Sequence, residues 1–196
     1  MAGWGFTVVA GGDGDTENHA TEVHSRCGHV VTDTSDACYI GAERPTNNTA
    51  ELTAIACALQ HVCADQSGRP ILIRYDSLYA GRMATGAWRA RKNHSLVARV
   101  RSLWAQAHRH LQGRLWASHV YGHTDHKWND RADELARRKG GAPMGAPPAN
   151  GRVVATEQME MDVDNQDKEK RERAGQSLMA PSGTMVCSVR DRPTLW

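Results

Sequence analysis

The amino-acid sequence predicts an α/β fold, a mixed sheet flanked by helices, followed by a C-terminal segment of different character. Short apolar stretches bounded by turn residues predict strands, and between them apolar residues recur at helical spacing. Residues that fill a core are concentrated early, because all four tyrosines, the one phenylalanine and five of the six tryptophans precede residue 139. We therefore expect one domain at residues 1–138, which is long enough to enclose a hydrophobic core.

The N-terminal part of this domain is predicted to form antiparallel strands. Residues 3–10 are aromatic and β-branched and end at two glycines, which is typical of a strand. A polar loop to about residue 24 separates them from a second strand, expected over residues 26–32. Residues 33–36 predict a turn, and residues 39–41 a short third strand.

The apolar period changes at residue 46 from that of strands to that of helices. Polar residues and an acid at residues 46–51 predict a helix start, and the stripe that follows predicts a helix ending near residues 66–68. The rest of the domain is expected to begin with a buried strand at residues 70–75 and two helices at residues 78–85 and 96–111. A last strand is expected at residues 115–121 and a last helix from about residue 129.

The C-terminal segment, residues 139–196, has the composition of a linker and a disordered tail. Residues 140–148 are rich in glycine and proline, which indicates a linker. Residues 157–173 combine seven acidic with four basic residues and few apolar ones, so they offer little surface to bury. We expect this tail to lack stable structure.

The cysteines and the overall charge bear on the compartment. Five cysteines form no CxxC pair, and Cys57 and Cys63 lie within an apolar helical pattern, which favours free thiols in a reducing compartment. The sequence predicts neither a signal peptide nor a membrane-spanning segment. We therefore expect an intracellular protein, in the cytoplasm or the nucleus. The net charge of +2 does not by itself indicate a partner.

Three acidic residues occupy special places in the predicted fold: Glu51 at a helix start, Asp76 at the end of a buried strand, and Asp133 near the start of the last helix. Strand ends and helix starts meet at one edge of an open α/β sheet, so these carboxylates can converge there. Hard oxygen ligands favour Mg²⁺ or Mn²⁺. The alternative is structural, with each acid serving as a helix cap, a helix-dipole partner or a solvated side chain.

A basic region lies between two of these acids. No acidic residue occurs between Asp76 and Asp125, whereas eight lysines and arginines do. Trp88 stands beside Arg89, Arg91 and Lys92, a combination that suits contact with phosphates and stacking on bases. The alternative is a solvated basic helix face, which applies above all to the bases at residues 99–114.

These motifs, in their order and spacing, resemble the type 1 ribonuclease H domain over roughly residues 1–138, and look closest to the ribonuclease H modules of retroelements. The resemblance is carried by Thr46-Asn-Asn-Thr-Ala-Glu-Leu52, Tyr75-Asp-Ser77, Gly122-His123 and Asn129-Asp-Arg-Ala-Asp-Glu-Leu-Ala136.

The resemblance implies an endonuclease that cuts the RNA strand of an RNA–DNA hybrid with two Mg²⁺ ions, which Mn²⁺ can replace. Glu51, Asp76 and Asp133 match three of the family's four metal ligands, and His123 matches a mobile histidine that assists proton transfer or product release. It also implies nucleic-acid contacts, and a reverse transcriptase domain as the partner in a longer protein. The residues that match such contacts are Asn47, Asn48, Ser77, Trp88, Arg89, Arg91, Lys92 and Asn129.

The sequence departs from the family pattern at the N-terminus. The family's fourth ligand is an aspartate on a first strand that precedes the segment matched by residues 3–10, whereas Asp13 and Asp15 follow that segment. We therefore expect the chain as written to lack this strand and to be impaired in stability and cleavage, and an N-terminal extension to increase cleavage. The alternatives are a catalytically dead remnant that still binds hybrid or double-stranded nucleic acid, and a fragment that does not fold alone.

Overall fold

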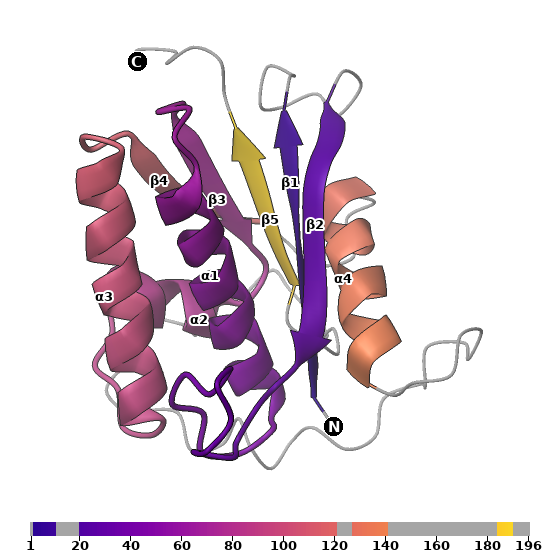
Figure 1. The fold of residues 1–196 in the computed structure, drawn as a ribbon, viewed down its shortest axis with the longest axis vertical. Helices are drawn as coiled ribbons and strands as arrows, with labels where there is room; N and C mark the ends of the chain where they lie inside the picture. The colour runs from indigo at the N-terminus through magenta and orange to yellow at the C-terminus, as the bar shows by residue number, and fades with distance from the viewer. Residues whose placement is uncertain (1, 11–19, 121–126, 141–183, 190–196) are drawn as a thin grey trace, which may run out of the picture. The chain divides into compact units, whose positions relative to one another are not determined.

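The computed structural model describes residues 2–10, 20–120, 127–140 and 184–189, and shows helices flanking a mixed sheet (Figure 1). This confirms the predicted α/β fold class. In the described residues the strands are β1 (Gly3–Ala10), β2 (Thr21–His29), β3 (Ile71–Tyr75), β4 (Leu115–His119) and β5 (Thr184–Val189). The helices are α1 (Asn47–Ala64), α2 (Leu78–Thr85), α3 (His94–His110) and α4 (Lys127–Gly140).

The five strands form one sheet in the order β2-β1-β5-β3-β4. The hairpin of β1 and β2 is antiparallel, with Gly3 opposite His29 at one end and Ala10 opposite Thr21 at the other. Strands β3 and β4 are parallel, and the chain between them includes α2 and α3. This βαβ-like connection is the usual way to join parallel neighbours.

Alternation along β1 assigns the helices to the two faces of the sheet. Trp4, Phe6 and Val8 point into the main core together with the apolar residues of α1 and α3. The intervening positions face α4, since Gly5 lies against the α4 backbone and Val9 packs with Trp128. Successive side chains of a strand point to opposite faces. Helix α1 therefore covers one face and α4 the other (Figure 1).

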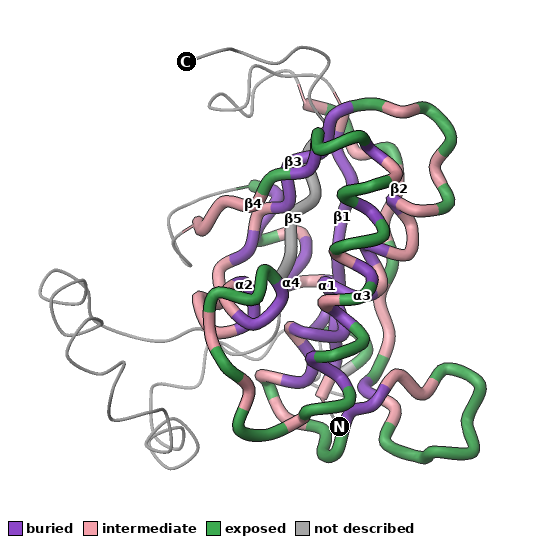
Figure 2. The backbone as a smooth tube through the Cα atoms, turned by 90° about the vertical axis from the view of Figure 1, so that its left-hand side faces the viewer, coloured by how far each residue is buried: buried purple, intermediate pink, exposed green. Residues whose placement is uncertain are grey.

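Helix α1 forms where the capping residues and the apolar stripe predicted it. Thr46 is the N-cap, and its side chain and that of Thr49 each accept from the other residue's backbone N–H. This reciprocal pair satisfies two donors that a helix start leaves open. Leu52, Ile55 and Leu59 are buried against the sheet. Helix α3 likewise buries one side and exposes the other (Figure 2).

The predicted strand at residues 39–41 is absent, and this expectation was wrong. Gly41 has φ of +108°, outside the extended region, and a side chain there would lie 2.6 Å from the backbone nitrogen of Leu96. The segment instead packs against the start of α3. Strand β2 also starts at Thr21, earlier than the predicted residue 26.

Strand β5 was not anticipated, because it lies within the segment that we expected to lack structure. Residues 184–189 run parallel to β1 and antiparallel to β3. The sequence Thr-Met-Val-Cys-Ser-Val is short and contains two valines, but nothing in it identifies its neighbours in the sheet. The remaining tail residues lie outside the described part of the chain. None of the described helices combines the length and the apolar character needed to span a membrane.

Candidate functional site

The three predicted carboxylates come from three different elements around one end of the sheet. Glu51 is the fifth residue of α1, Asp76 directly follows β3, and Asp133 is the seventh residue of α4. Glu51 and Asp133 therefore lie in the second turn of their helices, rather than in the first turn as predicted. Helix α1 starts at Asn47, so its first turn ends before Glu51. Helix α4 starts at Lys127, two residues before the expected start at about residue 129, which moves Asp133 out of the first turn.

Burial and mutual repulsion keep two of these carboxyl groups poorly ionised. Burial raises the pKa of Glu51 to about 7, and the charge of Asp133 adds to the rise. Burial also raises the pKa of Asp76 to about 8, with further contributions from Glu51 and Asp133. Both groups therefore respond to Asp133 as well as to their own desolvation. Such mutually perturbed acids are a frequent mark of functional sites.

The chemistry of this donor set fits a divalent cation. Glu51 Oε2 and Asp76 Oδ1 are buried and accept no hydrogen bond from the described residues. A hard cation bound here would supply the missing partner and offset the repulsion between the acids. Among the described residues, however, no three acidic, histidine or cysteine side chains converge closely enough to hold an ion as they stand.

Polar neighbours hydrogen bond the carboxyl groups of Glu51 and Asp76, whose pKa values are raised. Asn129 is only 1% exposed and hydrogen bonds the Asp76 side chain. The Ser77 hydroxyl accepts from the Ala80 backbone at the start of α2, at 3.2 Å, and also hydrogen bonds Glu51. His119 Nε2 lies 3.0 Å from the Asp76 carbonyl oxygen. Ser77 and Asn129, which the resemblance assigned to nucleic-acid contact, thus lie among the carboxylates.

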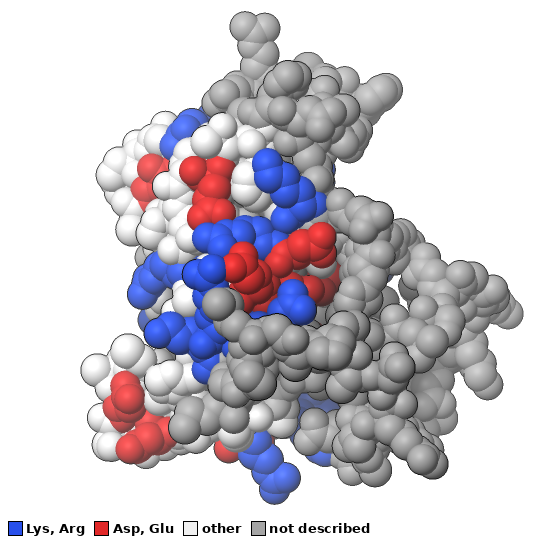
Figure 3. Space-filling view, turned by 90° about the vertical axis from the view of Figure 1, so that its right-hand side faces the viewer, with Lys and Arg blue, Asp and Glu red and all other residues white. Residues whose placement is uncertain are grey.

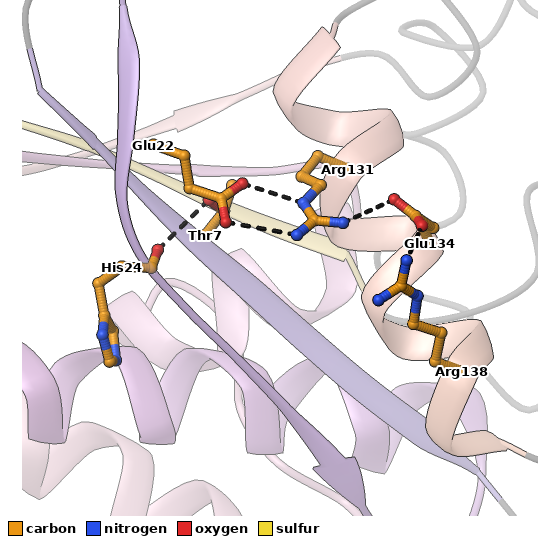
Figure 4. Close-up of polar contacts among 6 residues, drawn as sticks. All are labelled: Thr7, Glu22, His24, Arg131, Glu134 and Arg138. Atoms are coloured by element: carbon orange, nitrogen blue, oxygen red, sulfur yellow. Dashed lines mark hydrogen bonds and ion pairs between the residues drawn. The ribbon is translucent and has the colours of Figure 1, made fainter.

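Helix α4, which carries Asp133, is tied to strand β2 by an ion-pair network (Figure 4). Arg131 Nε donates to Glu22 at 2.9 Å, and Arg131 Nη1 donates to Glu134 at 2.7 Å. Arg138 extends the network by donating to the same Glu134. Hydrogen bonding to Arg131 lowers the pKa of Glu22. Sequence reasoning missed this pair because Glu22 lies far from Arg131 along the chain, in a stretch interpreted as a loop.

The surface around α4 carries charges of both signs. Figure 3 shows acidic side chains grouped together and bordered by basic ones. The ion pairs of Glu22, Arg131, Glu134 and Arg138 join α4 to β2 and also combine both signs of charge. Acids and bases paired in this way offset one another, so this face is not a uniformly basic surface for phosphates.

Replacing Arg131 with alanine is expected to lower the free energy of unfolding by about 1 kcal/mol, since the side chain joins two elements and is only 30% exposed. Arg138→Ala is the matched control, because it removes one bond to Glu134 within α4, and we expect a loss of about 0.3–0.5 kcal/mol. Urea denaturation measures both. Equal losses would show that the bond to β2 adds nothing to the fold.

The predicted nucleic-acid residues lie at two places outside the carboxylate cluster. Asn47 is exposed and Asn48 half-buried at the start of α1. Arg89, Arg91 and Lys92 are exposed in the connection between α2 and α3, whereas Trp88 is half-buried against the core.

Arg101, one of the eight lysines and arginines of the basic region, hydrogen bonds the connection between α2 and α3. Arg101 Nε donates to the Met83 carbonyl oxygen at 2.9 Å, and its guanidinium also donates to the carbonyl oxygen of Trp88. Arg101 therefore serves the fold, a role that its basic sequence context did not reveal. His123, the predicted mobile histidine, lies outside the described residues.

The arrangement of buried acids at one end of a mixed sheet agrees with a comparison to protein families. The family model for RNase H matches residues 11–140 of this chain. No curated protein and no solved structure gives a significant match. The family match covers well over half of the sequence and includes Glu51, Asp76 and Asp133. This chain belongs to the ribonuclease H family.

Proposed function

We propose that this protein is a ribonuclease H that cuts the RNA strand of an RNA–DNA hybrid internally. Membership of the family indicates a nuclease that hydrolyses nucleic acid. The observation that supports this site most strongly is the pair of buried carboxyl groups, Glu51 and Asp76, each with an oxygen that lacks a hydrogen-bond donor in the described residues. Asp133 is the third acid of the same cluster, and its charge contributes to the raised pKa of both Glu51 and Asp76.

In the proposed site, Glu51, Asp76 and Asp133 hold divalent cations, Mg²⁺ or in its place Mn²⁺. Two such ions would supply an activated water and stabilisation of the leaving oxygen. The protein's contribution is to orient the ligands: Asn129 holds the Asp76 carboxyl group, and Ser77 holds that of Glu51. His123 is the proposed proton carrier or release group, on the resemblance of Gly122-His123 to the family motif.

The hybrid is proposed to lie across the start of α1 and the α2–α3 connection. In this proposal, Asn47 and Asn48 contact the minor groove, where 2′-hydroxyl groups distinguish RNA from DNA. The exposed Arg89, Arg91 and Lys92 would contact phosphates, so binding should weaken as the salt concentration rises. On the resemblance to retroelement modules, we also propose that the domain works beside a reverse transcriptase in an intracellular compartment.

A binding module without cleavage activity is the second candidate. It is favoured by one observation: in the described part of the chain, no three ligands converge on a point that could hold an ion. The fourth carboxylate of the family pattern is also unmatched in residues 1–196, so we expect cleavage by this chain to be slow.

Cleavage of a labelled RNA–DNA hybrid tests the two candidates. We expect Mg²⁺-dependent cuts within the RNA strand, no cuts in DNA duplex of the same sequence, and no activity in Asp76→Asn. The control is Asp130→Asn, an exposed α4 residue, which should cleave like the parent protein. Hybrid bound by every variant and cleaved by none would support the binding module.

A further inference from the structure

Strand β5 occupies the centre of the sheet although it comes last in the chain. Its residues Thr184–Val189 pair with Gly5–Ala10 of β1 on one side and, from Met185, with Ile71–Tyr75 of β3 on the other. In the described part of the chain, β1 and β3 are not paired with each other. Because neighbouring strands lie about 4.8 Å apart, β5 holds β1 and β3 about 10 Å apart.

The carboxylate cluster draws its members from both sides of β5. Asp133 belongs to α4, which packs on β1, β2 and β5, while Asp76 directly follows β3. Removing β5 would leave these two groups on separate parts of the sheet, joined mainly through α1. The separation between Asp133 and Asp76 therefore depends on the strand that lies between their supports.

The start of β5 lies at the end of the sheet that carries the cluster. Thr184 is opposite Gly5, the residue against which α4 packs at Ala132 and Ala136. The next residue, Met185, is opposite Tyr75, whose neighbour in the chain is Asp76. The sequence of β5 contains no acidic residue. Its backbone can therefore set the spacing of the ligands without supplying one.

We propose, building on the cleavage site proposed above, that insertion of β5 and binding of a divalent cation by the carboxylate cluster are coupled. Inserted β5 brings the supports of Asp76 and Asp133 to a fixed spacing, and a cation held by the cluster would keep the same supports together. Each event therefore favours the other, and the coupling is reciprocal.

The connection between α4 and β5 bears on the free energy of inserting β5. Helix α4 ends at Gly140 and β5 begins at Thr184, so 43 residues separate them. Closing a loop of this length costs entropy, which the hydrogen bonds to β1 and β3 offset. A cation that binds only the assembled cluster would add to the free energy that favours insertion of β5.

Hydrogen exchange in the full-length protein tests the coupling without reference to cleavage. We expect the amides of residues 184–189 to exchange roughly tenfold more slowly with saturating Mg²⁺ than with EDTA at equal ionic strength. Helix α3 provides the internal control, because it packs on α1 and α2 and should show no such change. In Asp76→Asn the effect of Mg²⁺ on β5 should disappear.

Proline in the middle of β5 tests the coupling in the opposite direction. Val186 lies opposite Thr7 and Arg74, and Val186→Pro removes its backbone donor. Calorimetric titration should show Mg²⁺ binding weakened about tenfold in Val186→Pro. The control Val186→Thr keeps the backbone N–H and the branched side chain, and should bind within about twofold of the parent protein. Unchanged exchange in α3 confirms that the variants remain folded.

Three results would overturn the coupling: no Mg²⁺ binding by the parent protein, Mg²⁺ binding without slower exchange in β5, or parental affinity in Val186→Pro. Different results would refute the proposed cleavage activity. A protein that shows the coupling but cleaves no hybrid would refute the activity alone, whereas cleavage with β5 exchange unaffected by Mg²⁺ would refute the coupling alone.

Discussion

Asp76→Asn is expected to stabilise the metal-free protein while abolishing cleavage of the hybrid. Burial and the neighbouring acids raise the pKa of Asp76 to about 8, so ionising this group in the folded protein is unfavourable. Between about pH 4 and pH 8 the folded chain holds a proton that the unfolded chain has released, and the free energy of unfolding falls as pH rises through this window. Asparagine does not ionise, so Asp76→Asn should remove this decrease in the free energy of unfolding.

The expected gain at about pH 8 is about 2–4 kcal/mol in the free energy of unfolding, and it should vanish at about pH 3, where both states are protonated. Urea denaturation in EDTA across this range measures it. Asp130→Asn is the matched control, since this acid is exposed on α4 and its replacement should not raise the free energy of unfolding at about pH 8. A variant less stable than its parent at pH about 8 would show that the Asp76 carboxylate supports the fold.

Magnesium should reverse the order of stability. A cation that binds only the folded parent protein adds free energy of unfolding in proportion to the logarithm of its concentration above the dissociation constant. The parent protein should therefore gain stability with Mg²⁺, and more so as pH rises and the Glu51 and Asp76 carboxyl groups release their protons. Asp76→Asn should gain little. The combination of higher stability without metal and lost response to metal separates a cation site from a merely buried acid.

The sequence identified the acids because local signals fix their places in the chain. Asp76 ends an apolar strand run, and Glu51 follows the capping residues of α1, so both positions could be deduced from neighbouring residues. Asp133 lies close enough to raise the pKa of both groups. This proximity follows from a rule of α/β folds, that strand ends and helix starts converge at one edge of the sheet. Local patterns thus predicted most of the helices, and ordered motifs predicted the candidate site.

The contacts that position the acids depend on residues distant in sequence, and no local pattern indicated them. Glu22 pairs with Arg131 across 109 positions of the chain, and β5 inserts between strands that precede it by more than a hundred residues. Arg101 resembled the other bases of its region, although its hydrogen bonds hold the α2–α3 connection. A single sequence shows which residues could pair, whereas only packing determines which of them do.

Gly5→Val is expected to cost about 3 kcal/mol or more in the free energy of unfolding, because α4 crosses β1 with no space for a side chain. A Cβ at Gly5 would lie 2.8 Å from the Ala132 carbonyl oxygen and from the Ala136 nitrogen, and 2.7 Å from Leu135 Cβ. Two of these atoms belong to the helix backbone, so no change of rotamer relieves the clash. Helix α4 must then move away from the sheet.

This displacement should also weaken cation binding, because Asp133 lies on the turn of α4 that contacts Gly5. Thr7→Val is the matched control: Thr7 is fully buried on the same strand, and the change adds no heavy atom, so we expect a loss of about 1 kcal/mol or less and unchanged Mg²⁺ affinity. Calorimetric titration at a temperature where both variants remain folded separates the two effects. If Gly5→Val binds Mg²⁺ as tightly as Thr7→Val, the contact between α4 and β1 stabilises the fold without setting the position of Asp133.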